Sequence, residues 1–225
     1  MRRKRTITFA PALALLALIV QLSLPPEESR AATVLISEVL VDAPGSDNGK
    51  TFVELAGTPG LSLAGYTLVG VNGGTGSDYL TVDLSAFAIP ADGIFVAADT
   101  SGGVTEVAEA DALFASLDPQ NGPDSLQLRL ADVVVDALGY GDFTGAVFAG
   151  EGTAVSLPPA GSSLARLVAD ADTNDNAADF AALATPTPGA ASFSAPSPVP
   201  EPASLLLLGA SLLAFHRRLP PRPAP

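Results

Sequence analysis

The middle of the chain alternates between apolar and polar residues in short runs, and turn residues separate the runs at intervals of about ten residues. Alternation of this kind places successive side chains on opposite faces of a β-strand. Leu126, Leu128 and Leu130 would therefore face a core, and Gln127 and Arg129 would face solvent. We predict strands at residues 34–41, 51–56, 65–71, 79–84, 93–98, 125–130, 133–138 and 163–168, and one helix at 108–117. The pattern predicts an all-β domain, either a sandwich or a barrel.

The N-terminal end has the order of a secretory signal peptide. Basic residues at positions 2–5 precede an apolar segment at 7–24, and the small residues Ala31 and Ala32 follow. We predict a signal peptide at residues 1–31 that signal peptidase removes after Ala31 or Ala32. An uncleaved N-terminal anchor is the alternative. In both cases we expect the region that follows to be exported.

The C-terminal end combines a stiff proline-rich spacer, an apolar run at 203–215 and two arginines that favour the cytoplasmic side of a membrane. The run is shorter than the roughly 20 residues of a confident membrane span. We predict a Pro-rich stalk at 192–202, a short hydrophobic helix at 203–215 and a basic cytoplasmic tail at 216–225. The Pro- and Ala-rich composition that predicts an extended stalk already begins near Thr185.

This three-part pattern resembles the PEP-CTERM sorting signal of bacterial surface proteins. The residues that carry the resemblance are Val199, Pro200, Glu201, Pro202, Arg217 and Arg218. The resemblance implies that a membrane enzyme of the exosortase type recognises the chain and cuts it near Pro-Glu-Pro. It also implies delivery to the cell surface or the extracellular matrix.

Charge between the two ends is strongly negative. Of the 24 acidic residues, all except Glu27, Glu28 and Glu201 lie between residues 33 and 198, where the only basic residues are Lys50, Arg129 and Arg166. Such a field repels phosphate groups, so we expect no nucleic-acid partner. It favours cations, or it simply keeps a secreted protein soluble.

The residue types of the region also limit its chemistry. The chain has no cysteine, and its one histidine, His216, lies in the basic tail. Thiol nucleophiles, cysteine zinc sites and histidine-dependent triads are therefore excluded from the exported region. Glu38 and Glu54 fall on predicted strands, where an outward carboxylate is usually solvated, and the sequence does not give the separation that a glycosidase needs. We predict a protein that is not an enzyme.

Several segments together resemble a lamin-tail domain. They are Val-Leu-Ile-Ser-Glu-Val at 34–39, Phe-Val-Glu-Leu at 52–55, and the blocks 161–166, 172–180 and 185–189, the last reading Thr-Pro-Thr-Pro-Gly. The resemblance implies an immunoglobulin-like β-sandwich over residues 33–191. It also implies a non-catalytic module of the kind that secreted bacterial proteins contain.

The acidic loop within this region has two interpretations. Its oxygen-bearing residues are Asp170, Asp172, Asn174, Asp175, Asn176 and Asp179, and a short loop of this kind can wrap calcium with 6–8 oxygens. The loop is not an EF-hand, because Asp175 stands where that hand requires glycine. Alternatively, Asp172, Asn174 and Asn176 form Asx-turns, and Asp175 or Asn176 caps a helical turn that begins at Ala177.

The sequence as a whole predicts an exported, exosortase-sorted surface or matrix protein with a structural or adhesive sandwich. Expected partners are the exosortase-type enzyme and signal peptidase, with exopolysaccharide or other surface proteins as candidate ligands. A calcium- or glycan-binding extracellular module is the alternative, followed by a secreted hydrolase.

Overall fold

The computed structural model describes residues 34–190. The predicted signal peptide with its cleavage site at Ala31 or Ala32, the stalk at 192–202, the hydrophobic helix at 203–215 and the basic tail all lie outside the described residues. Among the described residues, no helix combines the length and the hydropathy that crossing a bilayer requires.

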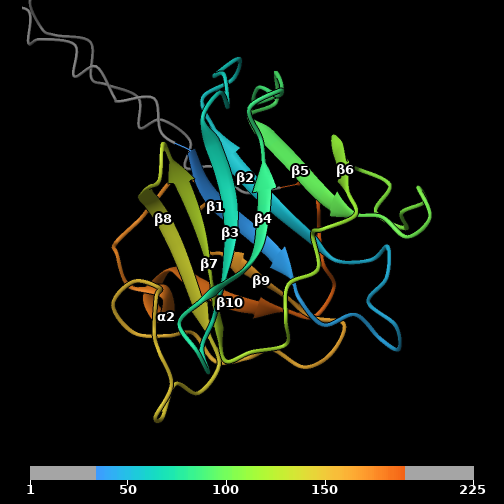
Figure 1. The fold of residues 1–225 in the computed structure, drawn as a ribbon. Coiled ribbons are helices and arrows are strands. Elements are labelled where there is room, and N and C mark those ends of the chain that lie inside the picture. The colour runs from blue at the N-terminus through green and yellow to red at the C-terminus, as the bar shows by residue number, and fades with distance from the viewer. Residues whose placement is uncertain (1–33, 191–225) are drawn as a thin grey trace, which may run out of the picture. The chain divides into compact units, whose positions relative to one another are not determined.

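The described strands form two sheets (Figure 1). The first sheet has the order β10 (Phe180–Leu183), β9 (Ser163–Arg166), β1 (Val34–Leu40), β2 (Phe52–Gly57), β5 (Ile94–Asp99) and β6 (Ala112–Phe114). The second has the order β4 (Asp78–Asp83), β3 (Tyr66–Asn72), β7 (Asp124–Leu130) and β8 (Val133–Tyr140). A single turn of helix, α2 (Asn176–Asp179), precedes β10. The all-β prediction is confirmed, and the two sheets are compatible with a β-sandwich.

The main core contains apolar side chains from both sheets. Ile36 and Val39 of β1 are both fully buried in it, although strict alternation would put them on opposite faces. A bulge between Ile36 and Glu38 shifts the register by one residue, so that Val39 returns to the core and Glu38 lies on the other face. The bulge thereby decides which side of the first sheet carries a carboxylate.

Alternation in β7 predicts the core residues better than the solvent-facing ones. Leu126 and Leu128 are fully buried, as predicted, whereas Leu130 at the strand end is 37% exposed. Gln127, predicted to face solvent, is only 9% exposed, and its Nε2 donates to the Ala149 carbonyl. The segment that follows β8 covers this face of the second sheet, which the pattern of β7 alone could not reveal.

The predicted helix at 108–117 is wrong. This segment instead forms β6, which pairs in parallel with the edge of β5. Asp111 initiates the pairing: its backbone N–H donates to the Val96 carbonyl, and its carboxylate accepts from the Val96 N–H. β10, which was not predicted, pairs with β9. Both are short edge strands, and the partner strand rather than the local pattern determines them.

Candidate functional site

A buried arginine joins the two sheets. Arg166, the last residue of β9, is 5% exposed, and its Nη2 donates to both carboxylate oxygens of Asp136 in β8 at 2.9 and 3.1 Å. Its Nε donates to the Ile36 carbonyl at 2.9 Å, and its guanidinium carbon lies 4.5 Å from the centroid of the Phe180 ring. Asp136 in turn accepts from the Ile36 N–H. The pair therefore connects β9 and β1 of the first sheet to β8 of the second.

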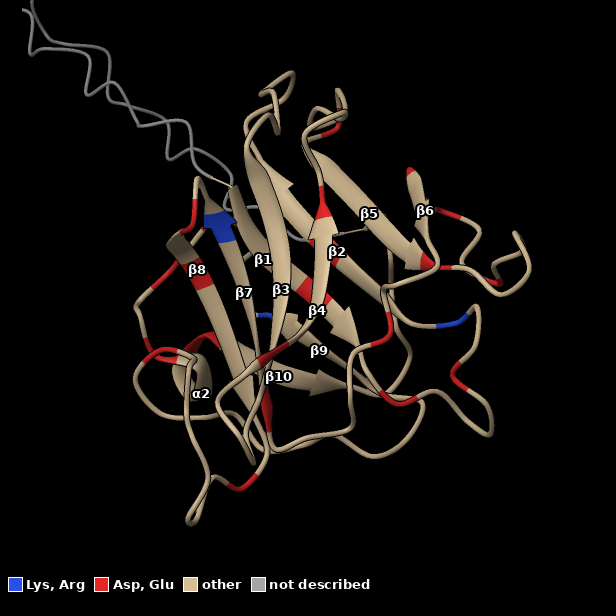
Figure 2. Ribbon diagram, viewed as in Figure 1, with Lys and Arg blue, Asp and Glu red and all other residues tan. Residues whose placement is uncertain are grey.

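The acidic loop folds around the same guanidinium. Nη1 of Arg166 lies 3.2 Å from an oxygen of Asp179, 3.4 Å from an oxygen of Asp172 and 3.1 Å from the Ala171 carbonyl. Asp179 also accepts from the N–H and the hydroxyl of Thr173. One cation thus neutralises carboxylates from a strand and from a loop, in a region where acidic residues far outnumber basic ones (Figure 2).

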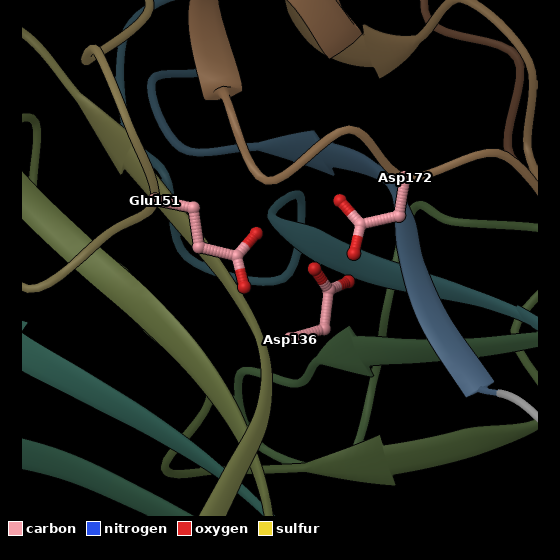
Figure 3. A group of neighbouring side chains, drawn as sticks. All are labelled: Asp136, Glu151 and Asp172. Atoms are coloured by element: carbon pink, nitrogen blue, oxygen red, sulfur yellow. The ribbon is translucent and has the colours of Figure 1, made fainter.

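Three carboxylates converge beside this arginine. Asp136, Glu151 and Asp172 each offer an oxygen, and these oxygens lie within 4.8 Å of one another (Figure 3). Burial raises the pKa of Asp136 to about 6 despite the attraction of Arg166. Burial, together with repulsion by Asp136 and Asp172, raises the pKa of Glu151 to about 7. Near neutral pH the group can therefore hold a proton on Glu151.

Glu151 is the distinctive member of the group. Its Oε2 is the single buried side-chain oxygen or nitrogen in residues 34–190 that lacks a hydrogen-bond partner. A proton shared with a neighbouring carboxylate would satisfy this oxygen, and so would a divalent cation with oxygen ligands. Arg166 opposes both, because its charge lowers the pKa of Glu151 and already neutralises part of the charge of Asp136 and Asp172 that a divalent cation would require.

The other residues of the predicted calcium loop have separate partners. Asp175 is the N-cap of α2 and accepts from the N–H groups of Ala177 and Thr153. Asn176 is fully buried: its Nδ2 donates to the Ala137 carbonyl, and its Oδ1 accepts from the N–H groups of Gly139 and Glu151.

Further along the same loop, Asp172 accepts from the Asn174 N–H, an Asx-turn in which Asn174 has a φ of 57°. Asp170 lies in the turn between β9 and α2. Asp172 and Asp179 meet at Arg166, whereas Asp175 and Asn176 bind backbone groups elsewhere. The calcium loop stays a prediction, and the capping role of Asp175 is confirmed.

Sequence reasoning did not single out Asp136 or Glu151, and it named Arg166 as one of three basic residues of the region and within the lamin-tail resemblance, without giving it a role in a site. The available signal was Arg166, one of few basic residues in a strongly acidic region and located on a predicted strand. A cation in that position requires buried carboxylates around it. Which carboxylates these are depends on how the sheets pack.

A second pair of buried carboxylates lies on the first sheet. Glu38 and Glu54 are cross-strand neighbours in β1 and β2 and are 2% and 0% exposed. The expectation that they are solvated is therefore wrong. Ser163 donates to Glu38 and Ser37 donates to Glu54, both at 2.6 Å. Burial raises the pKa of Glu54 to about 7, although hydrogen bonds from Ser37 and Gly189 oppose the shift.

Comparison with known families identifies the C-terminal end. Residues 198–222 match the PEP-CTERM protein-sorting motif, which confirms the predicted resemblance there. The motif implies export of the chain and recognition by an exosortase-type processing enzyme on the way to the cell surface. No lamin-tail family matches the chain, and no curated protein matches it.

Proposed function

We propose that the protein is a structural or adhesive component of the cell surface or its matrix, with a non-catalytic sandwich of the lamin-tail, immunoglobulin-like type. The observation that carries the proposal is the sorting motif at 198–222, which lies C-terminal to a folded all-β region. Proteins processed through such a signal leave the cytoplasm, so the sandwich would act outside the cell.

The buried carboxylates bind other groups of the protein, which supports a role without catalysis. A general acid or base must be able to reach its substrate. Glu38, Glu54 and Asp136 are instead almost completely buried and accept hydrogen bonds from protein donors. These groups hold parts of the fold together, which suits a rigid module whose outer surface binds matrix components.

Deletion of residues 198–222 tests the sorting part of the proposal. The protein would be followed in the cytoplasmic, membrane, surface and medium fractions of producing cells. We expect the full chain at the surface and the deletion variant absent from it. A chain with residues 191–197 shuffled keeps the motif and its spacing and serves as the control. Surface delivery of the deletion variant at the level of the full chain would refute the proposal.

The adhesive part is tested by sedimentation of the exported protein with exopolysaccharide from the same cells. We expect co-sedimentation that dextran of similar size does not reproduce. Release of reducing sugars during the incubation would instead indicate a hydrolase. Equal sedimentation with both polysaccharides, or with neither, would contradict specific adhesion to the matrix.

Calcium binding is the second candidate function. The favouring observations are the partnerless Oε2 of Glu151 and the convergence of one carboxylate oxygen each from Glu151, Asp136 and Asp172 within 4.8 Å of one another. At about 1 mM calcium, an extracellular site of ordinary affinity would add about 1 kcal/mol to the free energy of unfolding. Calorimetry with calcium and with chelator measures this gain, and Glu151→Gln should abolish it. Equal melting midpoints with calcium and with chelator would refute calcium binding.

A further inference from the structure

Residues 184–190, here named the C-terminal strap, connect β10 to the region that carries the sorting motif. Their composition predicts the start of an extended stalk, but the structure places them on the first sheet (Figure 1, the orange segment after β10). The strap holds the Thr-Pro-Thr-Pro-Gly sequence at 185–189, one of the blocks of the lamin-tail resemblance.

Two buried glutamates bind the strap. Glu38 accepts from both the N–H and the hydroxyl of Thr187, at 2.8 and 2.9 Å. Glu54 accepts from the N–H of Gly189 at 2.7 Å. Each glutamate is also fixed from the sheet side by a serine hydroxyl, so that both carboxylates are held toward the strap.

The strap sequence suits these acceptors. Residues 187–190 form a turn in which the Ala190 N–H donates to the Thr187 carbonyl at 3.0 Å. Pro188 has no N–H, so the donors left for the sheet are those of Thr187 and Gly189. Gly189 has a φ of 78°, and a Cβ at this position would lie 3.1 Å from the Cβ of Glu109. A Pro-Gly pair therefore gives the turn that directs both donors to the carboxylates.

We propose that Glu38 and Glu54 form a two-carboxylate latch that holds the strap on the first sheet and so fixes how far the folded domain extends toward the sorting motif. With the latch closed, residues 191–197 separate the domain from the sorting motif, a reach of at most about 25 Å. Opening the latch would add residues 184–190 and about double that reach. This consequence rests on the proposed function, because it concerns how close the domain stands to the processing enzyme.

Hydrogen–deuterium exchange of the full chain, read at single-residue resolution, tests the latch. In the unsubstituted protein we expect the amides of Thr187 and Gly189 to exchange far more slowly than unstructured chain. Thr187→Val removes one bond to Glu38 and should speed exchange at Thr187 about tenfold or more. Thr185→Val makes the same substitution two residues earlier, where the described structure has no bond to either glutamate, and should leave exchange unchanged.

Glu54→Ala tests the second carboxylate. In this variant the amide of Gly189 should lose its protection from hydrogen exchange, and the amides of β1 should keep theirs. Should that variant fail to fold, the Thr187→Val comparison still decides, because the strap lies outside both sheets. Exchange of both strap amides at the unstructured rate in the unsubstituted protein would overturn the latch, as would equal effects of Thr187→Val and Thr185→Val. Exchange does not depend on sorting, so a failed delivery experiment would leave this result intact.

Discussion

Replacement of Arg166 by methionine tests whether the buried arginine holds the two sheets together. Methionine keeps most of the side-chain volume and removes the charge. Asp136 and Asp179, whose side chains are 0% and 5% exposed, would then lose their cation. Leaving one partner of a buried ion pair uncompensated costs about 3–5 kcal/mol. For a domain of this size we expect the melting midpoint to fall by about 10 °C.

The matched control is Arg129→Met. Arg129 pairs with Asp78 at 2.7 Å, but the side chains of this pair are 19% and 45% exposed. Such pairs contribute about 0–1 kcal/mol. Urea unfolding followed by circular dichroism gives both values, since the chain has no tryptophan to report by fluorescence. The losses in the free energy of unfolding caused by Arg166→Met and Arg129→Met should therefore differ by about 3 kcal/mol.

A second measurement tests whether Asp136, left without its cation, causes the loss of stability. The pKa of Asp136 is raised to about 6 by burial while Arg166 opposes the shift, so removal of Arg166 should raise it further. A protonated carboxyl needs no cation, so the loss in Arg166→Met should be smaller near pH 5 than near pH 8. Adding Asp136→Asn to Arg166→Met should recover part of the lost free energy of unfolding. Equal losses for the Arg166 and Arg129 variants at both pH values would refute the reasoning.

Three further predictions concern the remaining buried groups. The pKa of Glu54 is raised from 4.5 to about 7, so its contribution to stability is lost as pH rises through this window. Melting scans should show higher stability at about pH 5.5 than at about pH 8, and Glu54→Gln should flatten the difference; a slope of the opposite sign would contradict the assignment. Asn176→Ala leaves buried backbone groups without partners and should cost about 3 kcal/mol in urea unfolding, and a loss under about 1 kcal/mol would be incompatible with that role. Gly150→Ala would place a Cβ 2.5 Å from the Asn176 Oδ1, whereas at Gly74, which like Gly150 has no positive φ, the nearest atom is the Asn72 Oδ1 at 3.2 Å. Gly150→Ala should therefore lower the midpoint well beyond Gly74→Ala, and equal midpoints would show that the contact relaxes freely.

Local patterns were sufficient for the parts of the molecule that depend on neighbours in sequence. Alternation located the long strands, because a strand with one buried face must repeat every second residue. The cap of α2 was predicted at Asp175 or Asn176, and the structure has it at Asp175, because capping involves residues only two or three positions apart. The PEP-CTERM motif at 198–222 is likewise contiguous and could be identified from order alone.

Predictions failed where a distant segment decides what a residue contacts. Residues 108–117 have a composition that allows a helix, but the free edge of β5 converts part of them to β6. Glu54 alternates as an outward residue does, and the bulge in β1 places Glu38 on the same face, yet the strap covers both. Gln127 is covered in the same way by the segment after β8. The first error concerns a sheet edge and the other two concern an outer sheet face, and no strand encodes by itself what covers either.

The amino-acid sequence alone determined that this protein is all-β, strongly acidic between its ends, free of cysteine and equipped with a sorting motif. Those properties follow from composition and from contacts within a few residues. Only the tertiary structure decided that Arg166, Asp136 and Glu151 meet, and that two glutamates hold the C-terminal strap. Burial of a charge is stable only with a partner, and that partner comes from wherever the folded chain brings one.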